Sequence, residues 1–73
     1  MTSERLNNTM KRHRAEKSIT QAKLAEMTGV TRKTINSVEN GVFIPSTVLA
    51  LKVAHALGKP VEALFILSDE RVS

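Results

Sequence analysis

Three glycines set the strongest constraint on this 73-residue chain: Gly29, Gly41 and Gly58. Each one follows a stretch with helical spacing of apolar residues, which is where a glycine commonly ends a helix. Each is then followed by a helix-start signal, namely Thr31, Ser46 or Pro60. No stretch alternates strictly between apolar and polar side chains as a half-buried strand would. The sequence therefore predicts an all-α fold with short connections.

The glycines and the start signals divide the chain into five predicted helices. The first begins between Ser3 and Asn8 and ends near Lys17, with Leu6 and Met10 on one face. The other four are predicted over residues 21–28, 32–40, 47–57 and 61–67. The length and the lack of a linker indicate a single domain over residues 1–73, with a compact core of about residues 8–67 and flexible ends.

The charge and the aromatic content narrow the class of partner. Eleven Lys and Arg against seven Asp and Glu give a net charge of +4, which favours a polyanionic partner. Phe43 and Phe65 are the only aromatic residues, too few both to build a core and to stack single-stranded bases. Double-stranded DNA is therefore the favoured nucleic acid.

Other classes of protein are excluded by what the sequence lacks. It has no cysteine, which excludes disulfides and cysteine-ligated zinc. It has no apolar run of the length of a signal peptide or a membrane span, so we expect a soluble, cytoplasmic protein with no membrane partner. It has no glycine-rich phosphate loop, metal-ligand spacing or nucleophile with a recognisable base. We therefore expect no enzyme, no metal and no cofactor.

The stretch from Gln21 to Gly41 carries the functional signal. Two short predicted helices meet at Gly29, which supplies the positive φ that turns the chain. Ala25 is small where the following helix crosses over it. Apolar residues fill the wedge between the two helices: Leu24, Val30, Ile35 and Val38. This spacing predicts a helix-turn-helix.

From about Asn8 to Phe65 the sequence resembles the Cro/phage-repressor type of helix-turn-helix, also called the xenobiotic-response-element family. The matching features are Arg14, Thr20-Gln21, Leu24-Ala25, Gly29-Val30, Ile35, Glu39-Asn40-Gly41, Pro45-Ser46, Ala54, Leu57-Gly58 and Leu64-Phe65. The resemblance implies a compact five-helix, lambda-repressor-like fold and a transcriptional repressor of bacterial or phage type. The chain departs from the family at Ser18, where a glycine is frequent, at His13, where a leucine is frequent, and in its apolar loop 42–44.

One face of the third predicted helix is expected to read DNA. Helical spacing turns Ile35 and Val38 toward the core. The opposite face carries Arg32, Lys33, Asn36, Ser37 and Asn40. Basic side chains at the N-terminal end of such a helix suit the acceptors of guanine in the major groove. The resemblance implies base contacts for Arg32, Lys33 and Ser37, and the spacing adds Asn36; the alternative is an ordinary solvated face.

Further positions are expected to hold the DNA backbone or the helices themselves. The start of the second predicted helix, at Gln21, offers a side-chain amide and free backbone amides to a phosphate. The resemblance implies further phosphate contacts at Thr31, Thr34 and Asn40, although Thr31 also fits a simple helix cap. It also implies a largely buried salt bridge between Arg14 and Glu39 that orients the recognition helix.

The chain has more apolar residues than one small core needs, which indicates a contact surface. On the fourth predicted helix the expected core face is Ala50, Leu51, Ala54 and Leu57. The surplus, expected at a homodimer interface, comprises Phe43, Ile44, Val48, Leu49, Phe65, Ile66 and Leu67. A two-fold dimer predicts an inverted-repeat operator. Alternatively, Phe43, Ile44 and Phe65 close the bottom of the core.

The remaining histidines and methionines are given ordinary structural roles. His13 and His55 are expected at the surface, and Met10 and Met27 in or near the core. One alternative function stays open: an antitoxin that binds a toxin protein and uses DNA only to regulate its own promoter. A restriction–modification controller or a prophage repressor would differ from the leading hypothesis only in its target genes.

Overall fold

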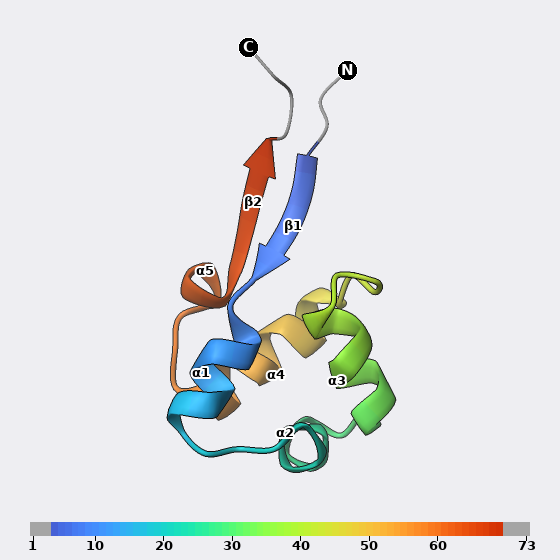
Figure 1. Cartoon of the computed structure of the whole chain (residues 1–73), viewed down its shortest axis with the longest axis vertical. Helices are drawn as coiled ribbons and strands as arrows, with labels where there is room; N and C mark the ends of the chain where they lie inside the picture. Colours follow the sequence, from blue (N-terminus) through green and yellow to red (C-terminus); the bar gives the residue numbers. More distant parts are fainter. Residues whose placement is uncertain (1–3, 70–73) are drawn as a thin grey trace.

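The computed structural model describes residues 4–69, which form five helices and two strands (Figure 1). The elements are β1 (Glu4–Asn8), α1 (Met10–Glu16), α2 (Gln21–Thr28), α3 (Arg32–Glu39), α4 (Thr47–Leu57), α5 (Val61–Leu64) and β2 (Phe65–Asp69). The helices pack into one body. The two strands, from opposite ends of the described chain, pair into an antiparallel ribbon that we call the hairpin. It projects from the end of that body opposite α2, which gives the molecule its long dimension of 40 Å.

The hairpin corrects the all-α prediction. β1 and β2 pair in an antiparallel ladder, with Leu6 opposite Leu67 and Asn8 opposite Phe65. Residues 65–67 therefore belong to a strand, not to a fifth helix, and the segment ahead of Asn8 is a strand, not the start of the first helix. Of the ends expected outside the core of residues 8–67, residues 4–7 and 68–69 belong to the two strands, and the rest lies outside the described residues. The ladder joins the two ends of the chain, so local periodicity could not predict it.

The junction between the hairpin and the bundle explains why α1 starts late. The Asn8 side-chain oxygen accepts a hydrogen bond from the Met10 amide at 3.2 Å, a local turn that opens the helix. The backbone N–H of Thr9 donates to the Leu64 carbonyl at 2.9 Å. Both strands are therefore anchored where α1 begins and α5 ends.

The predicted helix boundaries are otherwise confirmed, because they depend on local capping. The hydroxyls of Thr20, Thr31 and Ser46 accept hydrogen bonds from backbone amides three residues later, at 3.0–3.1 Å. α2 and α4 have the predicted bounds, and α3 ends one residue early, at Glu39. Gly29 closes α2 with φ 76° in the left-handed region.

Each of the five helices contributes to one apolar core. Its largest fully buried side chains are Met10, Leu24, Ile35, Val53, Leu57 and Leu64. The core face of α4 differs from the prediction, because Leu49 is 7% exposed and Leu51 is 53% exposed. α4 is apolar around most of its circumference, so its pattern did not define which face is inside. Met27, expected in or near the core, is 46% exposed.

His13 is buried, not at the surface as the sequence analysis expected. Its Nδ1 lies 3.0 Å from the Thr9 hydroxyl and 3.1 Å from the Thr9 carbonyl. That hydroxyl in turn donates to the Ala63 carbonyl at 2.7 Å. The imidazole is buried because these contacts satisfy it while it connects α1 with α5. His55 is exposed, as expected.

Ser18 is the only described non-glycine residue with positive φ, at 55°, and its conformation predicts a stabilising substitution. A non-glycine residue in the left-handed region costs about 1–2 kcal/mol, partly offset by the greater freedom of glycine in the unfolded chain. Ser18→Gly should therefore raise the free energy of unfolding by roughly 0.5–1 kcal/mol. Denaturant unfolding measures it, with Ser18→Ala as a control that should gain nothing. A lower unfolding midpoint for Ser18→Gly would contradict this account.

Candidate nucleic-acid interface

The corner between α2 and α3 is rigid and short. Only residues 29–31 separate the two helices. The amides of Gly29 and Val30 both donate to the Ala25 carbonyl, at 2.8 and 3.1 Å. Ala25 itself is 4% exposed, in keeping with the small side chain expected at the helix crossing. The corner therefore fixes how α3 leaves α2.

α3 divides cleanly into an inner and an outer face. Ile35 and Val38 are buried in the core, as helical spacing predicted. The residues expected to read bases lie elsewhere on the helix: Arg32, Lys33 and Asn36 are exposed, and Ser37 is half-buried. Asn40, the C-cap of α3, is also exposed. The outer face is thus polar and basic on an apolar support.

The salt bridge implied by the family resemblance is present and largely buried. Arg14 Nε donates to Glu39 Oε2 at 2.8 Å, and its NH2 donates to Oε1 at 3.2 Å. The side chains of Arg14 and Glu39 are 14% and 4% exposed. Arg14 NH1 also donates to the Ile19 carbonyl at 2.9 Å. The pair therefore ties α1 and the segment before α2 to the end of α3.

Gln21 extends this buried pair toward the surface. Its Nε2 donates to Glu39 Oε1 at 3.0 Å and to Asn36 Oδ1 at 3.1 Å. Its Oε1 lies 3.5 Å from Arg32 NH1. The side-chain amide expected to bind a phosphate is thus engaged within the protein, whereas the first backbone amides of α2 still lack intrahelical partners.

Thr31 and Thr34 interact with each other at the start of α3. The Thr31 hydroxyl accepts from the Thr34 amide at 3.1 Å, and the two hydroxyls lie 3.0 Å apart. The helix-cap role foreseen for Thr31 is therefore present.

The loop after α3 folds back against the outer face of that helix. The Ser37 carbonyl accepts hydrogen bonds from the amides of Val42 and Phe43, at 2.9 and 3.2 Å. Val42, Phe43 and Ser37 line a shallow hollow together with Lys33 and Thr34. The apolar loop therefore borders the side chains expected to contact DNA.

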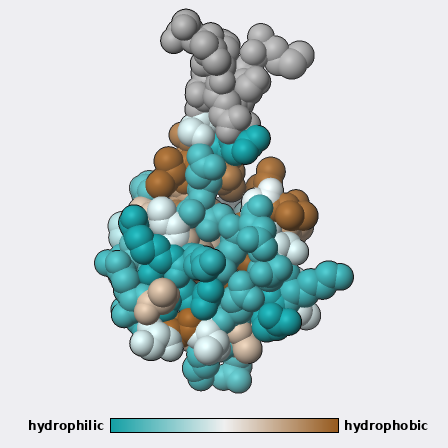
Figure 2. Space-filling model, viewed as in Figure 1, coloured by the Kyte–Doolittle hydropathy of each residue, from teal (hydrophilic) through white to brown (hydrophobic). Residues whose placement is uncertain are grey.

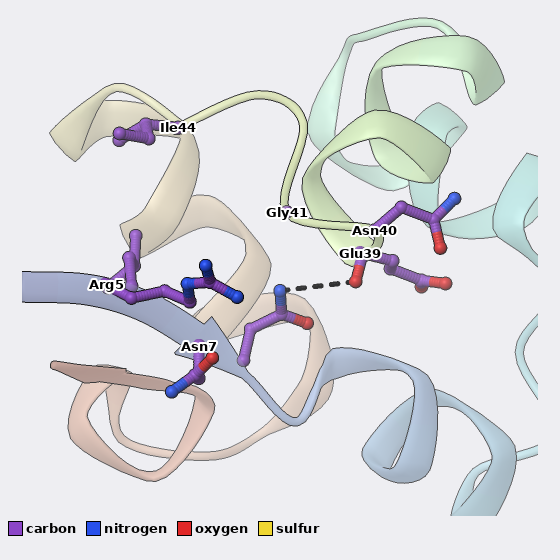
Figure 3. A pocket seen from close by; sticks show the side chains of 8 residues that line it. Arg5, Asn7, Glu39, Asn40, Gly41 and Ile44 are labelled. Atoms are coloured by element: carbon purple, nitrogen blue, oxygen red, sulfur yellow. Dashed lines mark hydrogen bonds between the residues drawn. The ribbon is translucent and has the colours of Figure 1, made fainter. Parts of the chain in front are cut away.

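Asn8 is a positioning residue that the sequence analysis missed. Its Nδ2 donates to the carbonyls of Val38 and Glu39, at 2.9 and 3.5 Å, where α3 ends. The bond to Glu39 is the dashed line in Figure 3. The Val38 carbonyl also accepts from the Gly41 amide at 3.1 Å, so Asn8 adds a further hydrogen bond at the end of α3. An asparagine ahead of a helix could have indicated only its local turn with Met10, because α3 lies 30 residues away.

Hydrophobic side chains gather at the hairpin and over the loop that follows α3, whereas the α2–α3 end is mostly hydrophilic (Figure 2). Of the residues expected at a dimer interface, five are exposed: Phe43, Ile44, Val48, Ile66 and Leu67. Leu49 is a core residue, which corrects the prediction for it, and the half-buried Phe65 packs against the core, in keeping with the alternative given for that residue. Among residues 4–69, no helix is long and apolar enough to span a membrane.

Comparisons with known proteins agree with this geometry. The family model described as helix-turn-helix matches residues 10–64. An uncharacterized HTH-type transcriptional regulator of Methanothermobacter thermautotrophicus is 42% identical over 66 residues, covering 89% of this chain and 96% of that protein.

Two solved structures are also similar. The restriction–modification controller protein C.AhdI of Aeromonas hydrophila has a TM-score of 0.71 and 31% identity, covering 74% of this chain and 82% of that one. The clp gene regulator ClgR of Corynebacterium glutamicum has a TM-score of 0.69 and 35% identity. The match covers 71% of this chain and about half (55%) of ClgR.

Proposed function

Because the chain belongs to the Cro/phage-repressor type of helix-turn-helix family and is a DNA-binding transcriptional regulator, we propose that it is a repressor that binds an inverted-repeat operator as a homodimer. One observation carries the proposal: α3 holds Ile35 and Val38 in the core while Arg32, Lys33 and Asn36 remain exposed on its outer face. A helix so supported can enter the major groove by its N-terminal end.

The polar residues on and near the outer face of α3 are assigned to two kinds of contact, with bases and with phosphates. Base readout is assigned to Arg32, Lys33, Asn36 and Ser37. Phosphate contacts are assigned to Gln21, Thr31, Thr34 and Asn40, with Gln21 acting through its backbone amide at the helix start, since its side-chain amide is engaged internally. The net charge of +4 favours association with the DNA polyanion.

A second copy of the chain is the proposed occupant of the apolar surface. Ile44, 72% exposed, and Leu6 of β1 both line one hollow, whose other side chains are mostly polar. Apolar residues of the loop and of the hairpin therefore border a polar hollow, which Figure 3 shows with Ile44 and Arg5 labelled. A domain of this length buries only about 60% of its unfolded-chain surface, which makes further burial by self-association favourable. A two-fold dimer would set two α3 helices about 34–36 Å apart, one turn of DNA.

Selection from random duplexes tests this function. An inverted repeat should be recovered, with half-sites about 10 bp apart from centre to centre. Sedimentation of the free protein at tens of micromolar should give the mass of a dimer. Recovery of a single half-site by a monomeric protein would reject the dimer, and recovery of no preferred sequence would reject the proposal as a whole. Repression itself is tested by placing the selected operator over a promoter.

Arg32→Ala should relax base preference. A bidentate contact from arginine to a base edge contributes about 1–3 kcal/mol of discrimination, so affinity for the selected operator should fall by about 5–150-fold. Affinity for unrelated duplexes should fall far less. Fluorescence anisotropy over a series of salt concentrations measures both, and Lys52→Ala, an exposed cation on α4, is the control. Equal losses on specific and unrelated DNA would show that Arg32 contacts only phosphate.

A further inference from the structure

We infer that a chain of hydrogen bonds starting at buried Arg14 fixes Asn36 as a hydrogen-bond donor toward DNA, so that it discriminates against cytosine, the one base whose major-groove edge offers no acceptor. This inference rests on the proposed function, since it assumes that α3 lies in the major groove. It concerns which way round the side-chain amide of Asn36 faces. Three steps lead from Arg14 to that orientation.

The first step is the polarity of Glu39. Arg14 has only N–H donors, and two of them point at the two carboxylate oxygens of Glu39, at 2.8 and 3.2 Å. Glu39 is held in one position because its side chain is only 4% exposed and is paired on both oxygens. The Glu39 oxygens therefore act as fixed acceptors at the inner end of the chain.

The second step is the orientation of Gln21. The Gln21 atom that lies 3.0 Å from Glu39 Oε1 has to be its NH2 group, because the alternative rotamer would set a carbonyl oxygen against a carboxylate oxygen. One hydrogen of that NH2 goes to Glu39. The second hydrogen is left to point toward Asn36, 3.1 Å away.

The third step is the orientation of Asn36. A flipped Asn36 would bring its NH2 against the NH2 of Gln21, with two donors facing each other and no acceptor between them. Asn36 Oδ1 therefore faces Gln21, and its Nδ2 is turned away toward solvent. Asn36 is exposed, so this NH2 group is available to a base edge.

The fixed polarity changes what Asn36 can recognise. The usual pairing of asparagine with adenine needs its oxygen and its NH2 side by side against the base. Here Gln21 already uses one lone pair of that oxygen, and the outward NH2 would meet the amino group of cytosine donor to donor, whereas adenine offers it N7 as an acceptor. Guanine and thymine present a keto oxygen at the corresponding place in the major groove, and guanine adds N7.

Selection from random duplexes with three proteins tests the inference. Asn36→Ala identifies the base position that Asn36 reads, as the one whose preference disappears. At that position the unaltered protein should bind cytosine about tenfold more weakly than the base it prefers. Gln21→Ala frees the amide of Asn36 to rotate and present its oxygen, so cytosine should rise to within about threefold of the preferred base, while preferences elsewhere in the operator persist.

Several outcomes would overturn the inference. They are a preference for cytosine at the position that Asn36 reads, discrimination against cytosine that is unchanged in Gln21→Ala, or no position that depends on Asn36. A matched variant sharpens the result: Asn36→Asp presents only acceptors and should reverse the preference to adenine or cytosine.

NMR of the free protein tests the hydrogen-bond chain without DNA. The side-chain NH2 of Gln21 should exchange with water more slowly than that of Asn36, and Glu39→Gln should abolish the difference. If the Gln21 side chain exchanges more slowly than that of Asn36 but no operator is recovered, the proposed function fails and base selection by Asn36 fails with it. If an operator is recovered but Gln21 exchanges as fast as Asn36, only the inference fails.

Discussion

Glu39→Gln should lower the free energy of unfolding by about 3–5 kcal/mol, because it leaves the Arg14 guanidinium buried beside a neutral amide. A domain of 73 residues has a total stability of about 4–11 kcal/mol, so the variant should lose roughly half of it. Urea unfolding followed by circular dichroism measures the loss. The substitution also removes the fixed acceptor on which the position of Gln21 depends.

The chain offers a matched control for this prediction. Glu26 pairs with Lys23 at 3.0 Å on the surface of α2, with side chains 74% and 57% exposed. Glu26→Gln makes the same chemical change where water screens the charges, and it should cost at most about 1 kcal/mol. If the two variants unfold at the same urea concentration, the buried pair does not have the structural role given to it here.

Ile35→Ala should cost about 2–5 kcal/mol, because it opens a cavity under the reading helix. Ile35 is fully buried on α3, between the outer face and the rest of the core. Ile35→Val removes a single methylene and should cost about 0.5–1.5 kcal/mol, which provides a graded comparison. Both values come from denaturant unfolding, and a loss below 1 kcal/mol for Ile35→Ala would mean that α3 settles into the space.

The same two variants distinguish the packing that supports α3 from the contacts of α3 with DNA bases. Neither substitution touches the outer face, so the base preference recovered by duplex selection should be unchanged wherever the variant is folded. Affinity should fall in proportion to the fraction unfolded. A changed preference in Ile35→Val would indicate that α3 shifts within the groove when its support is trimmed.

How far the sequence predicted the molecule depends on the range of each interaction. The starts of α2, α3 and α4 were predictable because each cap joins residues three apart, as Thr31 and Thr34 do. The inner face of α3 was predictable because only Ile35 and Val38 on that helix are large and apolar. The core face of α4 was not, because leucines and valines lie on several of its sides.

Interactions between distant segments account for the rest. The hairpin forms by pairing of β1 with β2, from Asn8 opposite Phe65 outward, and neither strand has a local sequence signal strong enough to predict this pairing. Asn8 holds the end of α3 and Gln21 orients Asn36. Both roles depend on residues that only the fold brings together. Periodicity placed Asn36 on the correct face but could not give the direction of its amide.

The hairpin also determines where a tag or a fusion partner would lie. Glu4 at the start of β1 pairs with Asp69 at the end of β2, so both ends leave the domain from one point, opposite α2 (Figure 1). An affinity handle or a fluorescent reporter fused at either end would therefore emerge on the side remote from the helix-turn-helix corner. Close termini also suit a circularly permuted version, with a short linker across the hairpin and new ends cut in a surface loop.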